Sequence, residues 1–370
     1  MNKNRFSKTE KRKISIERQK KEGDDAVEGN QSDKAVDPDI SSQKKKIQNR
    51  NRNLFFENLL VGDGVVPRVF PMEDSSEFIP ISFFQQIQRK IFKPDRAQIA
   101  LFHTLAERLD RDGYLFLKGF LNASAINQAR RFLLGEFSSH FQIDSEFSLD
   151  DARLAKFSSA DPQQTTTASV SLLSRQDLAH SEMVLSALEA PELYLLFFYL
   201  FSARLEEEVV DVATFDFKWL RAVEKKGFTG VHSDRVFFGN TQLHTAWIPL
   251  SKELAPEMGS LVVALGSHRS KDFKPILERY NETKLKADGT VSGWLTSDPN
   301  LLKARARWVT AKFQPGDVCI LNSEVIHASA TNATDQLRIS CDTRWIPIFK
   351  NSDATQSSIK LSPKRLKSLI

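Results

Sequence analysis

The sequence predicts an α+β protein in which helices come first and a β-sandwich or jelly roll follows. Residues 1–53 are polar and charged with one aromatic residue, Phe6, so they cannot bury the apolar surface that would offset their ordering entropy. Apolar residues then recur at helical spacing, and in the C-terminal half short β-rich segments alternate with turn residues. We therefore expect a disordered N-terminal tail, N-terminal packing helices and a β core.

The expected helices precede the β region. Residues 94–110 place apolar side chains on one helical stripe, which Asp112 and Gly113 end. A second helix is expected after Asn122 or Ser124, whose side chains can cap its first turn. The other elements expected here are a strand over 114–120, a loop over 149–171, and helices between about 172 and 207 with Pro191 in a first turn.

The C-terminal half reads as short strands. Phe215, Phe217 and Trp219 alternate with polar residues, which is the period of a half-buried strand. Further strands are expected over 231–238, 243–249, 260–264, 311–313, 318–322, 325–328 and 337–347. Many short strands at this spacing predict a sandwich or jelly roll. Residues 268–307 interrupt the pattern and are expected to form a lid or insertion.

Charge is distributed unevenly along the 370 residues. The formal net charge is +5, from 52 Lys+Arg and 47 Asp+Glu. Residues 1–53 hold 15 of these basic and 9 of these acidic residues, which leaves 37 and 38, a net of −1, for the rest. We therefore expect no nucleic-acid binding by the folded part. The basic tail is predicted to be a solvated segment, with a nuclear-import or polyanion-binding patch as the alternative.

No membrane span or secretory signal is expected. The longest apolar run, residues 193–201, has nine residues, far fewer than the roughly 20 that cross a bilayer, and predicts a buried helix. The N-terminus lacks a secretory apolar core, and residues 368–370 (SLI) are not the usual peroxisomal tripeptide. Cys319 and Cys341 fall in predicted core strands, which favours a reducing compartment. We expect an intracellular protein, cytoplasmic or nuclear.

Candidate metal ligands occur in two predicted strands. His232 and Asp234 are two residues apart, so the pleat of the predicted strand would point both side chains to one face. His327, on another predicted strand, can supply a third ligand. Two histidines and one carboxylate form the facial triad of non-heme Fe(II) oxygenases, which leaves coordination positions open. For each histidine alone, a surface or hydrogen-bonded core residue is the alternative.

A second motif follows this candidate site. Arg338 lies eleven residues after His327 on the next predicted strand, with Ser340 on the same side. A guanidinium group binds a carboxylate with two parallel hydrogen bonds, which a lysine does less specifically. A keto acid that chelates iron at one end requires a cation at its far carboxylate, so Arg338 favours this chemistry.

Several segments together carry a family resemblance. They are RDGYLFLKGF (111–120), GVHSDRVFFGN (230–240), TAWIPL (245–250), MGSLVVALGSH (258–268), GDVCILNSEVIHASATN (316–332) and LRISCDTRW (337–345). The chain resembles the phytanoyl-CoA dioxygenase family of Fe(II)/2-oxoglutarate oxygenases over roughly residues 97–347. The combination is specific, although each segment alone is not.

The resemblance implies a double-stranded β-helix, which is a cupin-like jelly roll. The site residues it implies are His232, Asp234 and His327 for iron, Arg338 for the distal carboxylate of 2-oxoglutarate, and Ser329, Trp247 and Ser340 for the co-substrate pocket. It implies a dioxygenase that consumes O₂, with ascorbate as a candidate reductant. The expected reaction hydroxylates a small organic or acyl-type substrate and releases succinate and CO₂. Retention of Asp234 favours hydroxylation over halogenation.

Two other functions stay open on the same residues. One is a zinc-dependent hydrolase, in which Arg338 has no assigned role. The other is a non-catalytic cupin-like binding protein. The partner expected in each case is a small molecule, and the sequence does not predict the oligomeric state.

Other residues near the motifs are weaker candidates for the metal site and its pocket. His244 has opposite strand parity to Trp247, so it would face away from the pocket. His268 falls in a predicted turn. Lys218 and Arg221 either approach the pocket from a neighbouring strand or are exposed strand charges.

The predicted oxygenase domain spans residues 54–350, between the basic tail and a C-terminal tail over 351–370.

Overall fold

The structure is a computed structural model, and its described residues belong to the compact unit Leu54–Ile370. The residues it describes are 55–79, 83–84, 96–138, 141, 143–155, 172–238, 241–283, 293–350 and 361–365. The predicted disordered tail over residues 1–53 lies outside them. So do residues 156–171, which make up most of the predicted loop over 149–171.

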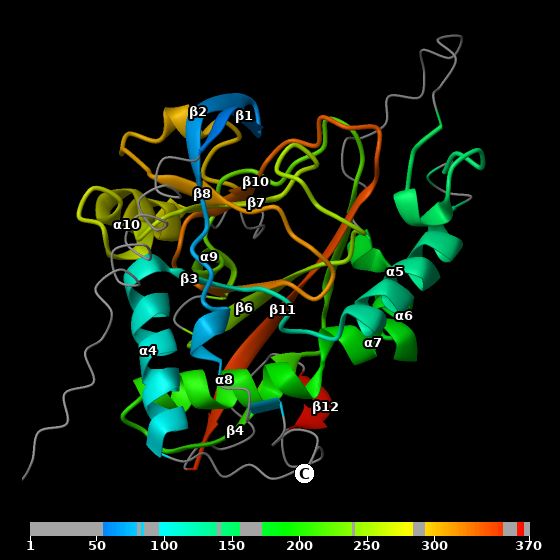
Figure 1. Ribbon diagram of the computed structural model, residues 1–370. Helices are drawn as coiled ribbons and strands as arrows, with labels where there is room; N and C mark the ends of the chain where they lie inside the picture. The colour runs from blue at the N-terminus through cyan, green and yellow to red at the C-terminus, as the bar shows by residue number, and fades with distance from the viewer. Residues whose placement is uncertain are drawn as a thin grey trace, which may run out of the picture. The chain divides into compact units, whose positions relative to one another are not determined.

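Two β-sheets form the jelly roll (Figure 1), which confirms the predicted α+β class. The smaller sheet has the order β1 (Phe56–Val61), β2 (Gly64–Pro71), β8 (Trp308–Thr310), β7 (Leu261–Ala264) and β10 (His327–Ser329). The larger has the order β12 (Leu361–Arg365), β4 (Val209–Phe215), β11 (Arg338–Phe349), β6 (His244–Pro249), β9 (Val318–Asn322) and β3 (Tyr114–Leu117), and β5 (Trp219–Val223) pairs with β11. The long strand β11 thus lies at the centre of the larger sheet.

Apolar side chains cover both faces of the larger sheet. In β3, Tyr114 and Phe116 belong to the cluster between the sheets, whereas Leu115 and Leu117 belong to the cluster under the helices. Since successive residues of a strand point to opposite faces, a strand buried on both sides is apolar throughout. The YLFL sequence of β3 therefore places it inside the fold, and the strand predicted over 114–120 ends at Leu117.

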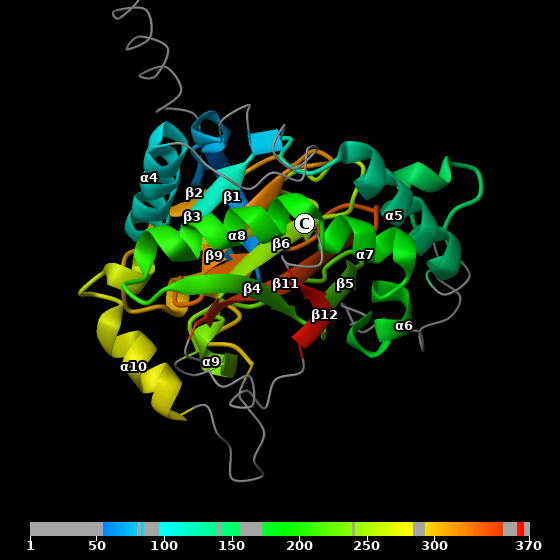
Figure 2. The ribbon, with the colours of Figure 1, turned by 90° about the horizontal axis from the view of Figure 1, so that it is seen from below.

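Helices cover the outer face of the larger sheet (Figure 2). They are α4 (Arg96–Asp112), α5 (Ala123–Phe137), α6 (Gln176–Ala179), α7 (Glu182–Leu188) and α8 (Pro191–Arg204). The side chain of Asn122 caps α5 by accepting hydrogen bonds from the backbone N–H groups of Ser124 and Ala125. Pro191 occupies the first turn of α8, as predicted.

One apolar stretch meets the length and composition of a membrane span among the described residues. It is Glu182–Arg204, and 72% of its most apolar window is buried inside the fold. In α8, the ring of Phe197 stacks on Trp345 of β11 with 4.8 Å between centroids. This burial is typical of a core helix.

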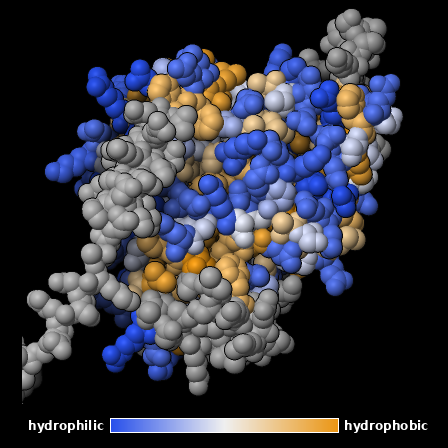
Figure 3. Space-filling view, viewed as in Figure 1, coloured by the Kyte–Doolittle hydropathy of each residue, from blue (hydrophilic) through white to orange (hydrophobic). Residues whose placement is uncertain are grey.

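On the face drawn in Figure 3, hydrophilic and apolar residues are interspersed.

The predicted insertion over 268–307 lies beside the smaller sheet. It contains α10 (Lys274–Thr283) and the short 3-10 helix η5 (Pro299–Leu301). Phe273 and Leu277 pack with Val262 of β7 in the cluster on the outer face of that sheet. The insertion therefore adds a layer, and its role as a lid stays a prediction.

Three predicted strands differ from the structure. Residues 231–238 were expected to be one strand, but only Val231 and His232 form β-bridges, and the helix α9 (Arg235–Phe238) follows. Residues 216–218 connect β4, which ends at Phe215, to β5, which begins at Trp219, so the alternation reflects a tight connection between two strands and not a single strand. The strand expected over 311–313 is β8, three residues earlier.

Other strands were not predicted. Strands β1 and β2 were missed because their residues alternate between buried and exposed only irregularly. At the other end of the chain, residues 361–365 of the predicted C-terminal tail form β12, which pairs with β4. Their sequence, LSPKR, has no apolar alternation that would have indicated a strand.

A buried ion pair joins the connection between β4 and β5 to the helices. The Nζ atom of Lys218 lies 2.8 Å from Oε1 of Glu189, and both side chains are fully buried. The same ammonium group donates hydrogen bonds to the carbonyl of Phe215 and the hydroxyl of Thr214. The alternative of an exposed strand charge is therefore wrong for Lys218.

Replacing Lys218 by methionine is expected to lower the free energy of unfolding by about 3 to 5 kcal/mol, because Glu189 keeps a buried charge without its counter-ion. The double variant Lys218→Met/Glu189→Gln should recover most of this loss. Urea unfolding measures both. Lys225→Met removes a surface pair with Asp335 and should cost less than about 1 kcal/mol. Equal losses of unfolding free energy in the two lysine variants would contradict the assignment of Lys218 and Glu189 as a buried ion pair.

Candidate metal centre

Backbone pairing brings the two predicted histidine ligands together. His232 and His327 lie directly opposite each other, and each donates its backbone N–H to the carbonyl of the other at 2.9 Å. Side chains of such a pair leave the same face of the sheet. Their ring centroids are therefore only 4.2 Å apart.

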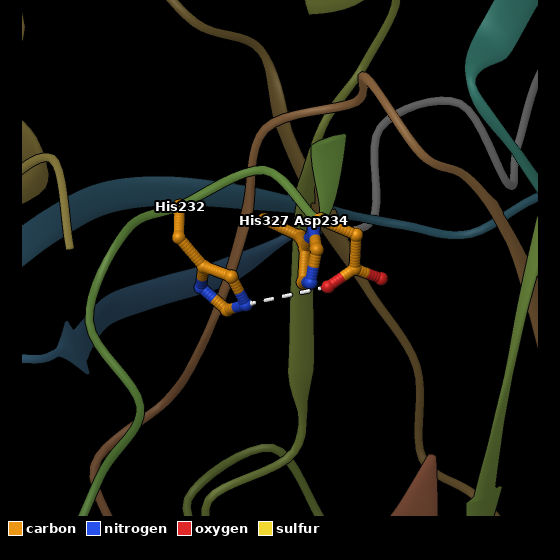
Figure 4. Close-up of side chains that lie close together, drawn as sticks. All are labelled: His232, Asp234 and His327. Atoms are coloured by element: carbon orange, nitrogen blue, oxygen red, sulfur yellow. Dashed lines mark ion pairs between the residues drawn. The ribbon is translucent and has the colours of Figure 1, made fainter. Parts of the chain in front are cut away.

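The three predicted ligands converge on one point (Figure 4). One ligand atom from each of His232, Asp234 and His327 lies within 4.8 Å of the others, and all three side chains are buried. The Nε2 atom of His232 is 3.9 Å from Oδ1 of Asp234. Asp234 stands in the turn before α9, so this turn, and not the predicted strand pleat, directs its carboxylate toward the histidines.

The hydrogen bonds of the rings leave the metal-facing nitrogens free. Nδ1 of His232 lies 2.8 Å from the carbonyl of Gly230, and Nδ1 of His327 lies 3.0 Å from the carbonyl of Val325. Because a carbonyl only accepts, each Nδ1 carries a proton, and Nε2 is the nitrogen of each ring that can bind a metal. Burial and the neighbouring His327 lower the pKa of His232 to about 3, so its imidazole is neutral at physiological pH.

Two side chains hold the carboxylate of Asp234. Thr245 donates a hydrogen bond to Oδ2 at 2.5 Å, and Arg344 donates one to Oδ1 at 2.8 Å. Burial raises the pKa of Asp234, but Arg344, the two neighbouring histidines and the hydrogen bond from Thr245 together outweigh it, so the pKa lies below its usual value. The site thus offers one fixed carboxylate and two imidazole Nε2 atoms, which fits Fe(II) or another divalent transition metal with positions left open.

Arg338 lines the same cavity as the histidines. His232, His327, Trp247, Ser329 and Arg338 are among the residues that line this cavity. Arg338 is 1% exposed and donates one hydrogen bond, from Nη1 to the carbonyl of Gly259 at 3.1 Å. Its Nε and Nη2 atoms are buried without a hydrogen-bond partner among the described residues.

The buried positive charge of Arg338 would be stabilised by a bound anion. Burial and repulsion from Arg221 lower its pKa to about 9, so the guanidinium group is still charged at neutral pH. A buried charge without a counter-ion is unfavourable, and two unused N–H groups on one edge match a carboxylate. The residues present therefore fit a keto acid whose distal carboxylate pairs with Arg338.

The remaining predicted pocket residues occupy different positions. Trp247 and Ser329 line the cavity, and the hydroxyl of Ser329 accepts a hydrogen bond from the backbone N–H of Thr229 at 2.7 Å. Ser340 is fully buried on the same face of β11 as Arg338, and its hydroxyl has no hydrogen-bond partner among the described residues. It does not itself line the cavity.

The two other histidines considered lie elsewhere. The ring of His244 stacks on Phe201 of α8, with 4.9 Å between centroids, on the helix side of the larger sheet. Nε2 of His268 lies 2.9 Å from the backbone carbonyl of Asp110. Neither side chain faces the candidate metal centre.

Arg344 and Thr245 were not predicted as site residues, and the role of Arg221 stayed open. The sequence of β11 holds the signal for Arg344. Arg338, Ser340, Asp342 and Arg344 recur every second residue, whereas Ile339, Cys341 and Trp345 pack under the helices. Polar residues on one face of an otherwise buried strand indicate an interior site.

Gly230 lets the insertion approach the metal centre. A Cβ atom at this position would lie 2.5 Å from ring carbons of Trp294, and the adjacent Val231 pairs with Thr296 of the insertion. Replacing Gly230 by alanine should therefore displace the segment that carries His232. We expect a loss of about 1 to 3 kcal/mol in unfolding free energy, together with weaker Fe(II) binding.

Adding Trp294→Ala to that variant should restore both properties, since it removes the ring that the new methyl group meets. Urea unfolding and anaerobic Fe(II) titration measure the two effects. Unchanged Fe(II) affinity in Gly230→Ala would show that the approach of Trp294 does not position the histidine.

Comparison with known proteins places this site in a family. The profile of the phytanoyl-CoA dioxygenase (PhyH) family matches residues 109–340, more than half of the chain, and this range includes all three candidate ligands and Arg338. No curated protein sequence matches the chain.

Three solved structures illustrate the similarity. The epimerase SnoN, in complex with Fe3+, alpha ketoglutarate and nogalamycin RO, is 19% identical, with a TM-score of 0.45, over 70% of this chain and 92% of SnoN. EctD from S. alaskensis is 19% identical over 66% of this chain and 76% of EctD (TM-score 0.40). AviO1 from Streptomyces viridochromogenes is 20% identical over 72% and 99%, respectively (TM-score 0.41). On the family match, the chain belongs to the phytanoyl-CoA dioxygenase family.

Proposed function

We propose that this protein is an Fe(II)- and 2-oxoglutarate-dependent dioxygenase that hydroxylates a small organic or acyl-type substrate. In the balanced reaction, substrate C–H, O₂ and 2-oxoglutarate give substrate C–OH, succinate and CO₂. One oxygen atom enters the product and the other enters succinate. Membership of the phytanoyl-CoA dioxygenase family supports this class of enzyme.

A single observation carries the proposal. The cavity that holds His232 and His327 also holds Arg338, a buried guanidinium group whose Nε and Nη2 atoms have no hydrogen-bond partner among the described residues. A hydrolase that uses zinc requires the three ligands but has no use for this cation. A keto acid that binds the metal at one end and Arg338 at the other accounts for both features.

The chain itself supplies orientation and charge. His232, Asp234 and His327 would hold the metal, and Arg338 would fix the far carboxylate of 2-oxoglutarate. Trp247 and Ser329 would shape the pocket around it. When bound, iron supplies the redox chemistry that couples O₂ reduction and 2-oxoglutarate decarboxylation to oxidation of the substrate. Ascorbate is proposed as a reductant that keeps the metal in the Fe(II) state.

Formation of succinate tests the proposal. The purified full-length protein should form succinate and CO₂ only with Fe(II), O₂ and 2-oxoglutarate present, and a screen of candidate substrates should raise the rate. His327→Ala should abolish this turnover, while His268→Ala, a histidine outside the cavity, should retain it. Turnover that Zn(II) supports without 2-oxoglutarate would favour the hydrolase instead.

We also propose an intracellular location, cytoplasmic or nuclear. The observation in its favour is that Cys319 and Cys341 are both free and fully buried. Imaging of the tagged full-length protein tests this location.

A further inference from the structure

Arg221 is the accessible cation of the metal cavity. Its side chain is 26% exposed, whereas Arg338 is 1% exposed and the side chain of Arg344 is 4% exposed. Arg221 lies on β5, opposite Ser340 of β11, and lines the cavity with His232. It contributes to the lowered pKa of both Arg338 and His232, which places its charge near the co-substrate cation and the metal ligand.

The guanidinium group of Arg221 is only partly neutralised. Its Nε atom is 3.7 Å from Oδ2 of Asp342, beyond hydrogen-bond distance, and the same oxygen lies 3.5 Å from Arg344. Asp342 is therefore shared between two cations. The side chain of Arg221 donates no hydrogen bond within the part of the chain that the structure describes, and a planar guanidinium group at the edge of a cavity is suited to a planar anionic group.

Counting charges assigns this anion to the substrate. The charged side chains that line the cavity, or bond to those that do, are the cations Arg221, Arg338 and Arg344 and the anions Asp234 and Asp342, a net of one positive charge. Fe(II) and 2-oxoglutarate carry opposite charges of equal size, so their binding leaves this excess unchanged. One further negative charge completes the balance, which matches a carboxylate better than a phosphate ester of nearly two charges.

The side chains around Arg221 indicate the chemical character of the rest of the substrate. Trp219 precedes it by two residues on the same face of β5 and contacts the rings of Phe217 and Phe238. Phe217 is 39% exposed, and Phe237, whose ring centroid is 6.2 Å from that of His232, is 42% exposed. The guanidinium group of Arg344 lies over the rings of Trp219 and Phe238, 4.1 and 5.6 Å from their centroids, and the exposed parts of this aromatic cluster offer an apolar wall to the remainder of the ligand.

We infer that the substrate is an apolar monocarboxylate, whose carboxylate pairs with Arg221 and whose ring or chain lies on the wall formed by Phe217, Trp219, Phe237 and Phe238. This inference rests on the proposed function, because the charge balance includes Fe(II) and 2-oxoglutarate. It makes Arg221 a residue that selects the substrate, distinct from Arg338.

Three probes of similar shape test the inference on the full-length protein loaded anaerobically with Fe(II) and 2-oxoglutarate. They are phenylacetate, its neutral counterpart phenylacetamide, and phenyl phosphate, titrated in the millimolar range against the visible band of the Fe(II)–2-oxoglutarate complex. Phenylacetate should perturb the band with a Kd about tenfold or more below those of the other two. Arg221→Met should remove this preference and leave the Kd of 2-oxoglutarate within about threefold.

Lys225→Met provides the matched control, since it removes one positive charge of the same segment outside the cavity. Equal binding of phenylacetate and phenylacetamide, or no response to either, would overturn the inference, and tighter binding of phenyl phosphate would overturn the choice of a single charge. A large rise in the Kd of 2-oxoglutarate in Arg221→Met would reassign Arg221 to the co-substrate. Absence of the band before any probe is added would instead defeat the proposed function.

Discussion

Arg338→Met should weaken 2-oxoglutarate binding by about two to three orders of magnitude while making the unliganded protein more stable. The first effect follows because removing one partner of a buried charge pair costs about 2 to 5 kcal/mol, and each 1.4 kcal/mol is a tenfold change in Kd. The second follows because the free protein carries Arg338 buried without a counter-ion among the described residues. Isothermal titration and urea unfolding of the same variant measure both effects.

Arg338→Lys separates charge from geometry. Lysine keeps the positive charge but not the two parallel N–H groups, so its Kd for 2-oxoglutarate should fall between those of the wild type and the methionine variant. Loss of stability in Arg338→Met, with 2-oxoglutarate affinity unchanged, would mean that Arg338 has a structural role only.

Asp234→Ala should abolish turnover and lower Fe(II) affinity by at least about a hundredfold. Loss of a group that merely orients a ligand costs up to about that factor, and here the ligand itself is removed. The substitution also leaves Arg344 buried without its closest carboxylate, so the unfolding free energy should fall by about 3 kcal/mol or more.

The double variant Asp234→Ala/Arg344→Met distinguishes these two effects. It removes both charges of the pair, so most of the lost stability should return while Fe(II) binding stays weak. Recovery of Fe(II) binding together with stability would indicate that Asp234 acts on the fold and is not a ligand.

The fold class could be predicted because its signals are local. The stripe within α4, the cap at Asn122 and the fully apolar strand β3 each depend on residues close in sequence. The connection between β4 and β5 was mistaken for a strand because aromatic and polar residues alternate there, and α9 was mistaken for one because it is short and consists largely of Val and Phe. Their conformation is decided by tertiary contacts, such as the buried pair of Lys218 with Glu189, that no local pattern contains.

The three candidate ligands lie close together as expected, but the backbone brings them together in a different way than the sequence suggested. Residue type and spacing selected His232, Asp234 and His327, which do converge. The expected strand pleat does not exist at Asp234; a backbone bridge and a turn position the side chains instead. Arg344 was missed because its contact with Asp234 spans 110 residues of sequence.

The central claim is that one cavity holds both the metal and 2-oxoglutarate, and the visible spectrum tests it most directly. Anaerobic addition of Fe(II) and then 2-oxoglutarate to the full-length protein should produce a metal-to-ligand charge-transfer band. The band should vanish in Asp234→Ala and require far more 2-oxoglutarate in Arg338→Met. Absence of the band in wild-type protein that has bound one equivalent of Fe(II) would contradict the claim.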